Sequence, residues 1–356
     1  MKPQFNTLAE IYEHSVTSFP KRTAAEFVGG AQSYTYAQFR DCCDNISKRL
    51  SNFGIGAGDK VAILSENSPN WSAAFFAITV YGRIAIPMLP ELSAGEVENI
   101  LVHSEAKAIF VSKKQLPKLS EEAIGRLKLV IAIGDLSFIK AEGSSYTCDG
   151  KVSRPTALDT AAILYTSGTT GKAKGVMLCH RNFCTNVLTS WYSYKIGPRD
   201  VFLSILPMAH TYEMSIGMLY PFAMGAKVEY LQKVPTPSIL IATLAKIRPT
   251  AMLSVPLIIE KIYRSSIVPT ISKSKFLSYL DKHAKGLLYT MVGMKLKKTF
   301  GGRIGFFGIG GAKLDPEVEV FLKKARFPYA IGYGLTETAP LICSAAPRRT
   351  WPGTTG

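Results

Sequence analysis

The chain has 356 residues, of which 47% are hydrophobic, so it is long enough for two or three compact units with a large core. Its net charge of +16 favours anionic partners such as nucleotides or a membrane surface, whereas no interleaved basic and aromatic motif indicates nucleic acid. The polar start from Met1 to Thr7 has no apolar leader, so we expect a cytoplasmic protein rather than a secreted one. None of the six cysteines forms a Cys-x-x-Cys pair, which predicts reduced thiols.

Helix and strand patterns alternate through the first part of the chain. Ser68-Pro69 combines an N-cap with a proline at the first helical position, and Ser93–Glu96 reads as a capping box. These signals and the apolar periodicity predict helices over 39–53, over 68–81 and after 93, and strands over 60–64, 108–111 and 129–133. The alternation is typical of a mostly parallel sheet with helices on both faces.

A segment rich in glycine, hydroxyl and lysine side chains follows the predicted strand 161–165 and reads YTSGTTGKAKG over 165–175. Glycines let the backbone present N–H groups to an anion, hydroxyls donate further hydrogen bonds, and lysines supply positive charge. The segment lacks Walker A spacing. We predict a phosphate-binding loop, with a polar surface turn as the alternative. Its candidate ligands are Thr166, Ser167, Gly168, Thr169, Thr170, Gly171, Lys172 and Lys174.

The second part of the chain repeats the alternation. Helices are predicted over 181–194, 237–246, 256–263 and 315–324, and strands over 201–206, 251–254, 303–308 and 329–331. Two further glycine-rich turns, Gly310–Ala312 and Gly332–Thr338, follow the last two of these strands. Open α/β sheets bind ligands at the carboxyl ends of their strands, so we expect the three turns to converge on one nucleotide between two sheets.

The three motifs, in this order, resemble the adenylate-forming (AMP-binding) superfamily, and the segment 254–263 resembles its long-chain-fatty-acid–CoA ligase branch. The resemblance implies an α/β fold of two doubly wound, mostly parallel sheet subdomains packed together. Residues 1–356 would form the AMP-binding N-terminal domain. Within it, 45–195 would carry the phosphate loop, and 1–44 plus 196–350 would carry the adenine-site motifs. A barrel-like region and a C-terminal domain would follow, so we expect a fragment of a longer enzyme, with a natural truncation as the alternative.

The resemblance also implies roles for individual residues in nucleotide binding. The phosphate loop would hold the ATP phosphates. The backbone of Gly310, Gly311 and Ala312 would line the adenine pocket, and the ring of Tyr333, next to Gly334, would stack on adenine. The alternative for Tyr333 is a tyrosine of the core.

Three further residues are catalytic candidates. By the resemblance, Thr336 would contact the α-phosphate and Glu337 would hold Mg²⁺, which prefers oxygen ligands. His210, in LPMAHTYE, would border the acyl pocket, with a hydrogen-bonded structural histidine as the alternative.

The implied activity is that of an AMP-forming acid–thiol ligase. ATP would convert a fatty acid to acyl-AMP, and coenzyme A would then accept the acyl group. This chain has no counterpart of the family's ribose-binding aspartate or C-terminal lysine, so we expect weak turnover from it alone. The alternatives are an enzyme that loads a carrier protein or an amino acid, and a non-catalytic basic membrane-binding module.

The segment 273–303 is strongly basic, with eight Lys or Arg and one acidic residue, Asp281. Its apolar residues recur at helical spacing: Leu277, Leu280, Leu287, Met291 and Met294. This pattern predicts a basic amphipathic helix in peripheral contact with an anionic membrane at its inner face. The alternative is a helix that packs on the protein's own core and exposes its lysines to solvent.

Overall fold

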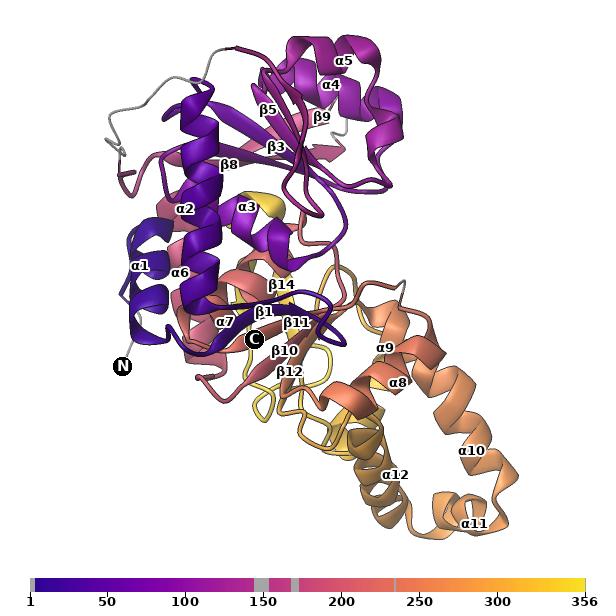
Figure 1. Ribbon diagram of the computed structural model, residues 1–356. Coiled ribbons are helices and arrows are strands. Elements are labelled where there is room, and N and C mark those ends of the chain that lie inside the picture. Colours follow the sequence, from indigo (N-terminus) through magenta and orange to yellow (C-terminus); the bar gives the residue numbers. More distant parts are fainter. Residues whose placement is uncertain (1–3, 144–153, 168–172, 234, 356) are drawn as a thin grey trace.

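The computed structural model describes residues 4–143, 154–167, 173–233 and 235–355. It contains two β-sheets with helices on both faces, so the α/β fold expected from the sequence is confirmed (Figure 1). In each sheet the inner strands pair in parallel, and the outermost strand at either edge is antiparallel to its neighbour. The carboxyl ends of the inner strands therefore share one edge, where α/β proteins bind ligands.

The seven-stranded sheet is built from one continuous part of the chain. Its alternate side chains face different layers: Val61 and Ile63 belong to the core between the sheets, whereas Ala62 and Leu64 belong to the outer core. This two-sided burial explains the uninterrupted apolar runs of its strands. In spatial order the strands are β7 (Phe138–Ala141), β6 (Leu129–Ala132), β5 (Ala108–Val111), β3 (Lys60–Leu64), β4 (Ile84–Met88), β8 (Thr160–Ser167) and β9 (Ala173–Cys179).

The eight-stranded sheet combines two strands near the N-terminus with six from the second half of the chain. Parallel pairing of Ala25 with Val228 joins the two sets. In spatial order the strands are β15 (Leu341–Ser344), β14 (Tyr329–Gly334), β13 (Phe306–Ile309), β12 (Ala251–Ser254), β10 (Val201–Ser204), β11 (Lys227–Tyr230), β1 (Thr23–Phe27) and β2 (Ser33–Thr35). The strand order shows which segments form each sheet but does not define subdomains. The division into a first subdomain over 45–195 and a second over 1–44 plus 196–350 stays a prediction.

Helices fill the space between the sheets and cover both outer faces. The middle layer contains α1 (Leu8–Ser18), α2 (Tyr36–Asn52), α3 (Pro69–Thr79), α6 (His180–Ser193) and α7 (Tyr220–Ala223), and every residue of α3 is buried there. Beside the seven-stranded sheet lie α4 (Ala94–Ser104), η1 (Leu116–Lys118) and α5 (Glu121–Arg126). Beside the eight-stranded sheet lie α8 (Pro237–Ile247), α9 (Pro256–Ile262), η3 (Tyr263–Ile267), α10 (Val268–Lys273), α11 (Lys275–His283), α12 (Lys285–Thr299) and α13 (Pro316–Lys324).

The basic segment 273–303 does not form the single helix that its periodicity predicts. The chain turns at Ala284, where φ is −146° and ψ is 51°, and divides the segment into α11 and α12. Leu280 lies in the core beside the eight-stranded sheet, whereas Leu287 and Met294 are 53% and 63% exposed. The prediction of one apolar stripe was therefore wrong, because α11 and α12 pack against each other and use different faces. Among the described residues, no helix is both long and apolar enough to cross a membrane.

Candidate functional site

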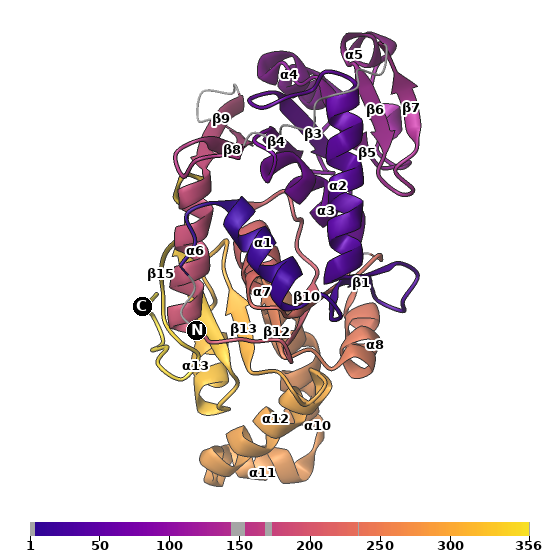
Figure 2. The same cartoon turned by 60° about the vertical axis from the view of Figure 1, so that its left-hand side comes forward.

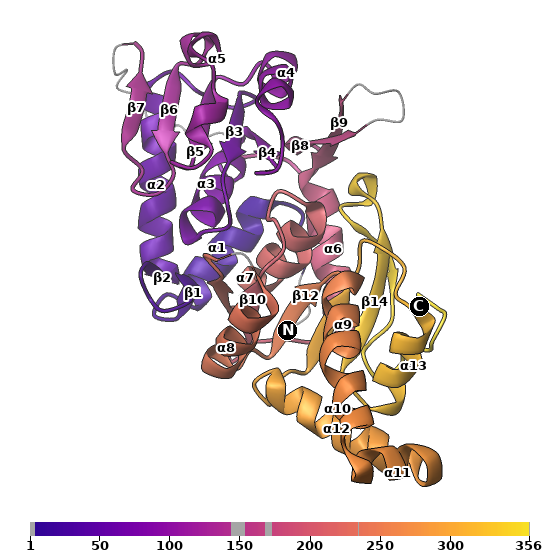
Figure 3. The ribbon, with the colours of Figure 1, turned by 90° about the vertical axis from the view of Figure 1, so that its right-hand side faces the viewer.

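The phosphate-loop candidate lies on a hairpin. Strand β8 continues through Thr166 to Ser167, and β9 begins at Ala173, with Thr166 opposite Lys174 (Figure 3). The prediction of a loop over all of 165–175 was therefore wrong at its two ends, because antiparallel pairing satisfies the backbone groups there. Gly168, Thr169, Thr170, Gly171 and Lys172 lie outside the described residues.

The turn Gly310–Ala312 follows β13 and approaches two other parts of the site. The Gly310 N–H donates a hydrogen bond to the Ser254 carbonyl at the end of β12, at 3.2 Å. A Cβ atom at Gly310 would lie 3.2 Å from the ring of Tyr212, so the missing side chain permits this close approach. Gly311 has a φ of +86°, in the left-handed region that glycine adopts readily.

Strand β14 carries the third motif and extends three residues beyond the predicted end at 331. Tyr333 pairs with Cys343 of β15, and its side chain is 51% exposed. The alternative that Tyr333 belongs to the core is therefore wrong, and its ring is accessible at the carboxyl end of the strand. At Gly334 a Cβ would lie 1.8 Å from the Pro340 carbonyl oxygen, so only glycine fits between β14 and the returning chain.

A buried asparagine fixes the turn that carries Thr336 and Glu337. Asn186 of α6 is 4% exposed; its amide nitrogen donates to the Thr338 carbonyl at 2.9 Å, and its amide oxygen accepts from the Leu341 N–H at 2.8 Å. The short helix η4 (Thr336–Thr338) ends at the first of these two contacts. Because α6 directly follows β9, this clamp ties the turn to the β8–β9 hairpin (Figure 2). Strand β9 itself also contacts η4.

The loop that carries His210 is held from the other sheet. The Asn67 side-chain nitrogen donates to Ser204 Oγ at 3.0 Å and to the Leu206 carbonyl at 2.6 Å, and its oxygen accepts from the Met208 N–H at 2.9 Å. The His210 side chain is exposed at the end of this loop. Asn67 and Asn186 were not identified from the sequence, because no local sequence pattern predicts that an asparagine will hydrogen-bond residues far away in the chain.

A small cavity lies between Tyr212, two residues after His210, and the strands β13 and β14. It has a volume of about 30 Å³, and Tyr212, Ile216, Gly308 and Gly332 contribute to its walls. A Cβ atom at Gly308 would lie 2.9 Å from the Tyr212 hydroxyl, so the tyrosine ring fills the space that the glycines leave. The cavity has room for about one water molecule, and a longer occupant requires Tyr212 to move.

Glu213 is a buried carboxyl that directly follows Tyr212 in the chain, at the start of the π-helix η2 (Glu213–Leu219). It is 1% exposed, and its Oε2 has no hydrogen-bond partner among the described residues. A Cβ at Gly217 would lie 2.7 Å from its carboxyl carbon. Burial raises the pKa of Glu213 to about 8, with a hydrogen bond from Ser204 opposing the shift, so the carboxyl is mostly protonated at neutral pH.

Metal ligands are sparse near the motifs. In the ranges that the structure describes, no three His, Cys, Asp or Glu side chains are grouped so that they could hold a metal ion. Glu337 is a single exposed carboxylate on η4. One carboxylate still fits Mg²⁺, which commonly takes one or two carboxylates together with substrate phosphates and water.

The structure therefore brings together the described parts of the three motifs, namely the hairpin arms with Thr166 and Lys174, the turn at Gly310, and the segment from Tyr333 to Glu337. His210 lies on a neighbouring loop. Their roles toward a ligand stay predictions.

A family model described as AMP-binding enzyme matches residues 12–356. The peroxisomal long chain acyl-CoA synthetase 6 of Arabidopsis thaliana is 30% identical over 381 aligned positions, which cover 96% of this chain and 54% of that protein. The chain thus spans about half the length of this relative.

Solved structures share the fold at lower identity. An anthranilate CoA ligase in complex with anthranoyl-AMP has a TM-score of 0.77 at 18% identity, covering 99% of this chain and 64% of that one. The N-terminal domain of FACL13 from Mycobacterium tuberculosis, with a bound inhibitor, has a TM-score of 0.72 at 21% identity, covering 94% and 77%.

Buried Glu213 predicts a pH-dependent stability. Between its ordinary pKa of 4.5 and about 8, the folded chain holds a proton that the unfolded chain has released, so the free energy of unfolding falls as pH rises. Glu213→Gln removes this dependence. We expect the free energy of unfolding of Glu213→Gln, relative to that of the wild type, to increase from pH 5 to pH 8 by up to about 1.4 kcal/mol per pH unit.

Urea denaturation at several pH values measures this difference, and Glu121→Gln, at an exposed carboxylate, is the control that should stay parallel to the wild type. Parallel curves for Glu213→Gln and the wild type would show that Glu213 is ionised in the folded chain.

Proposed function

Since this chain belongs to the family of AMP-binding enzymes, we propose that it is the ATP- and acyl-binding part of a ligase that activates a fatty acid. The observation that carries the proposal is the clamp at Asn186, which holds the Thr336–Glu337 turn against the β8–β9 hairpin. The similarity to long chain acyl-CoA synthetases supports a fatty acid as the substrate and coenzyme A as the acceptor.

The reaction that fits this site needs charge stabilisation rather than a nucleophilic side chain. A carboxylate oxygen attacks the α-phosphorus of ATP, a new P–O bond forms, and the bond to the leaving pyrophosphate breaks with its electron pair. No proton moves in this step. Lys174 and the N–H and hydroxyl groups of the hairpin would stabilise the phosphate charge, and Thr336 would donate to the α-phosphate. Mg²⁺, held by Glu337, would neutralise further charge when bound.

The second half-reaction would transfer the acyl group to a thiol. The thiol of coenzyme A releases its proton to solvent, its sulfur attacks the acyl carbonyl to form the thioester, and the acyl–oxygen bond breaks so that AMP leaves with the electron pair. A carrier-protein thiol would react by the same chemistry, so it stays the alternative acceptor. The small cavity beside Tyr212 would receive the acyl chain after that ring turns. His210 does not line this cavity, so its place at the border of the acyl pocket rests on the family resemblance alone.

We expect ATP binding to depend on Lys174. Replacement by alanine removes a charged partner of the phosphates, worth about 1.5–3 kcal/mol, so the affinity for Mg-ATP should fall by roughly tenfold to a hundredfold. Isothermal titration of this chain measures the change. Lys21→Ala, at an exposed lysine beyond α1, is the control and should bind as the wild type does. Equal affinities for all three proteins would refute the phosphate assignment.

We also propose a cytoplasmic protein in peripheral contact with an anionic membrane through 273–303. Phe276 and Tyr279 of α11 are 57% and 60% exposed among lysines, which supports this contact. We expect co-sedimentation with phosphatidylglycerol vesicles at low salt and release at high salt, because each lysine contributes about 1 kcal/mol that salt screens. Phe276→Ser should weaken the binding, and no sedimentation at low salt would refute the contact.

A further inference from the structure

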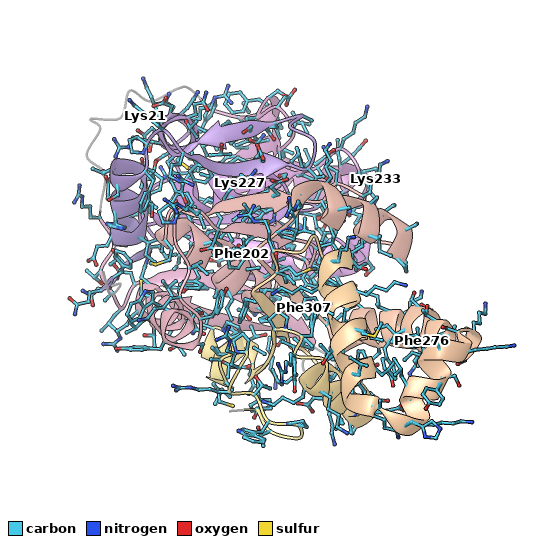
Figure 4. The ribbon with its side chains drawn as sticks, turned by 90° about the horizontal axis from the view of Figure 1, so that it is seen from below. Lys21, Phe202, Lys227, Lys233, Phe276 and Phe307 are labelled. Atoms are coloured by element: carbon cyan, nitrogen blue, oxygen red, sulfur yellow. The ribbon has the colours of Figure 1, made fainter. Side chains whose placement is uncertain are left out.

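The helices α8 to α12 form a lobe at the outer face of the eight-stranded sheet. Figures 1 and 3 show α10, α11 and α12 projecting away from both sheets. In the view from below, Phe276 lies toward the far end of this lobe, whereas Phe202 and Phe307 lie in the body of the protein (Figure 4). The reaction proposed above uses no residue of this lobe.

An apolar cavity of about 480 Å³ opens between these helices. Its deep wall is formed by buried side chains of α8, η3 and α12, namely Leu244, Ile267 and Leu296, and by Phe300. Met291, one turn before Lys295 on α12, lines the opposite end. This volume and lining are typical of small-molecule sites, which are mostly apolar with a few polar groups.

The lining follows α12 lengthwise. From Met291 to Phe300 the helix advances nine residues, or about 13 Å at about 1.5 Å per residue. A wall of this length has room for a hydrocarbon chain that lies along α12. The flexible methionine at one end suits a chain without a fixed shape.

Three of the four polar residues that line the cavity are at its mouth, and the fourth, Thr299, is half-buried and donates to the Lys295 carbonyl. Ser266, Thr270 and Lys295 are exposed there, and none of the lining residues is acidic. The Thr270 hydroxyl already donates to the Ser266 carbonyl, at 2.6 Å, so it has no proton left for a ligand. Lys295 lines the cavity and is exposed, so its methylene stem can cover apolar surface while its ammonium group stays in water at the rim. The surrounding excess of lysines adds to the positive potential.

We propose that this cavity binds one long-chain carboxylate, with its hydrocarbon chain against the deep wall and its carboxylate at Lys295. The site differs from the small cavity beside Tyr212, because the two share no lining residue and lie on opposite faces of the eight-stranded sheet. The proposal goes beyond the adenylation function and requires no ATP.

The test is photolabelling of the whole chain with palmitic acid that carries a diazirine near its methyl end, without ATP or lipid, followed by mapping of the labelled peptides. We expect label within 241–300. Met291→Trp fills the cavity and should reduce this label by at least about tenfold, whereas Met294→Trp, at an exposed position outside the lining, should keep it. Thr270→Trp blocks the mouth from the opposite wall at an exposed residue, so it provides a second variant should Met291→Trp not fold.

The proposed contact between the ligand carboxylate and Lys295 is tested by reversing the charge of the lysine. Lys295→Glu should weaken binding of palmitate about tenfold or more, as loss of a charged hydrogen bond does, and Lys298→Glu, outside the lining, should not.

Label that persists in both Met291→Trp and Thr270→Trp, or that lies only outside 241–300, would overturn the proposal. Capture of the chain by anionic vesicles without labelling by soluble palmitate would also overturn it, in favour of surface contact. Mg-ATP affinity should be unchanged in all of these variants, so a failure here is distinct from a failure of the adenylation proposal.

Discussion

The geometry of the candidate site depends on one buried amide. Asn186 accepts one hydrogen bond from the turn between β14 and β15 and donates another to it, while its helix α6 directly continues the β8–β9 hairpin. An unpaired amide at this depth would cost about 1–3 kcal/mol, so the turn and the helix are fixed together. Asn67, which follows a strand of the seven-stranded sheet, likewise hydrogen-bonds the loop that carries His210 and holds it in place. Two asparagines thus connect elements that belong to different sheets.

Close packing around glycines sets the shape of the site between those connections. Gly308 and Gly310 make room for Tyr212, and Gly334 makes room for the Pro340 carbonyl. Behind them, Gly217 makes room for the buried carboxyl of Glu213 within a π-helix, a feature that often accompanies functional sites. The cavity beside Tyr212 is consequently small, and its size depends on the position of one tyrosine ring. The lobe of α8 to α12 has the opposite character, with a roomy apolar cavity and a basic rim.

Local signals in the sequence predict much of this fold, and long-range contacts account for what they miss. Caps at Ser68 and Ser93 and apolar runs such as Lys60–Leu64 identify helices and strands, because these signals act within a few residues. Strand β4 was not predicted, since it contains Pro87, which argues against a strand in the middle of a sheet, and it is recognisable only from its pairing with β3. The split of 273–303 likewise follows from packing between α11 and α12. For the same reason the motifs predict the glycine-rich turns but neither Asn67 nor Asn186.

The central claim is that three segments distant in sequence act on one nucleotide. Hydrogen–deuterium exchange of this chain with and without saturating Mg-ATP tests it most directly, because each segment reports separately. We expect backbone amides in 166–175, 310–312 and 332–338 to gain protection together at the same ATP concentration. The exchange rates of the amides in α10, α11 and α12 should stay unchanged. Protection confined to one of the three segments, or protection at clearly different ATP concentrations, would contradict a single shared site.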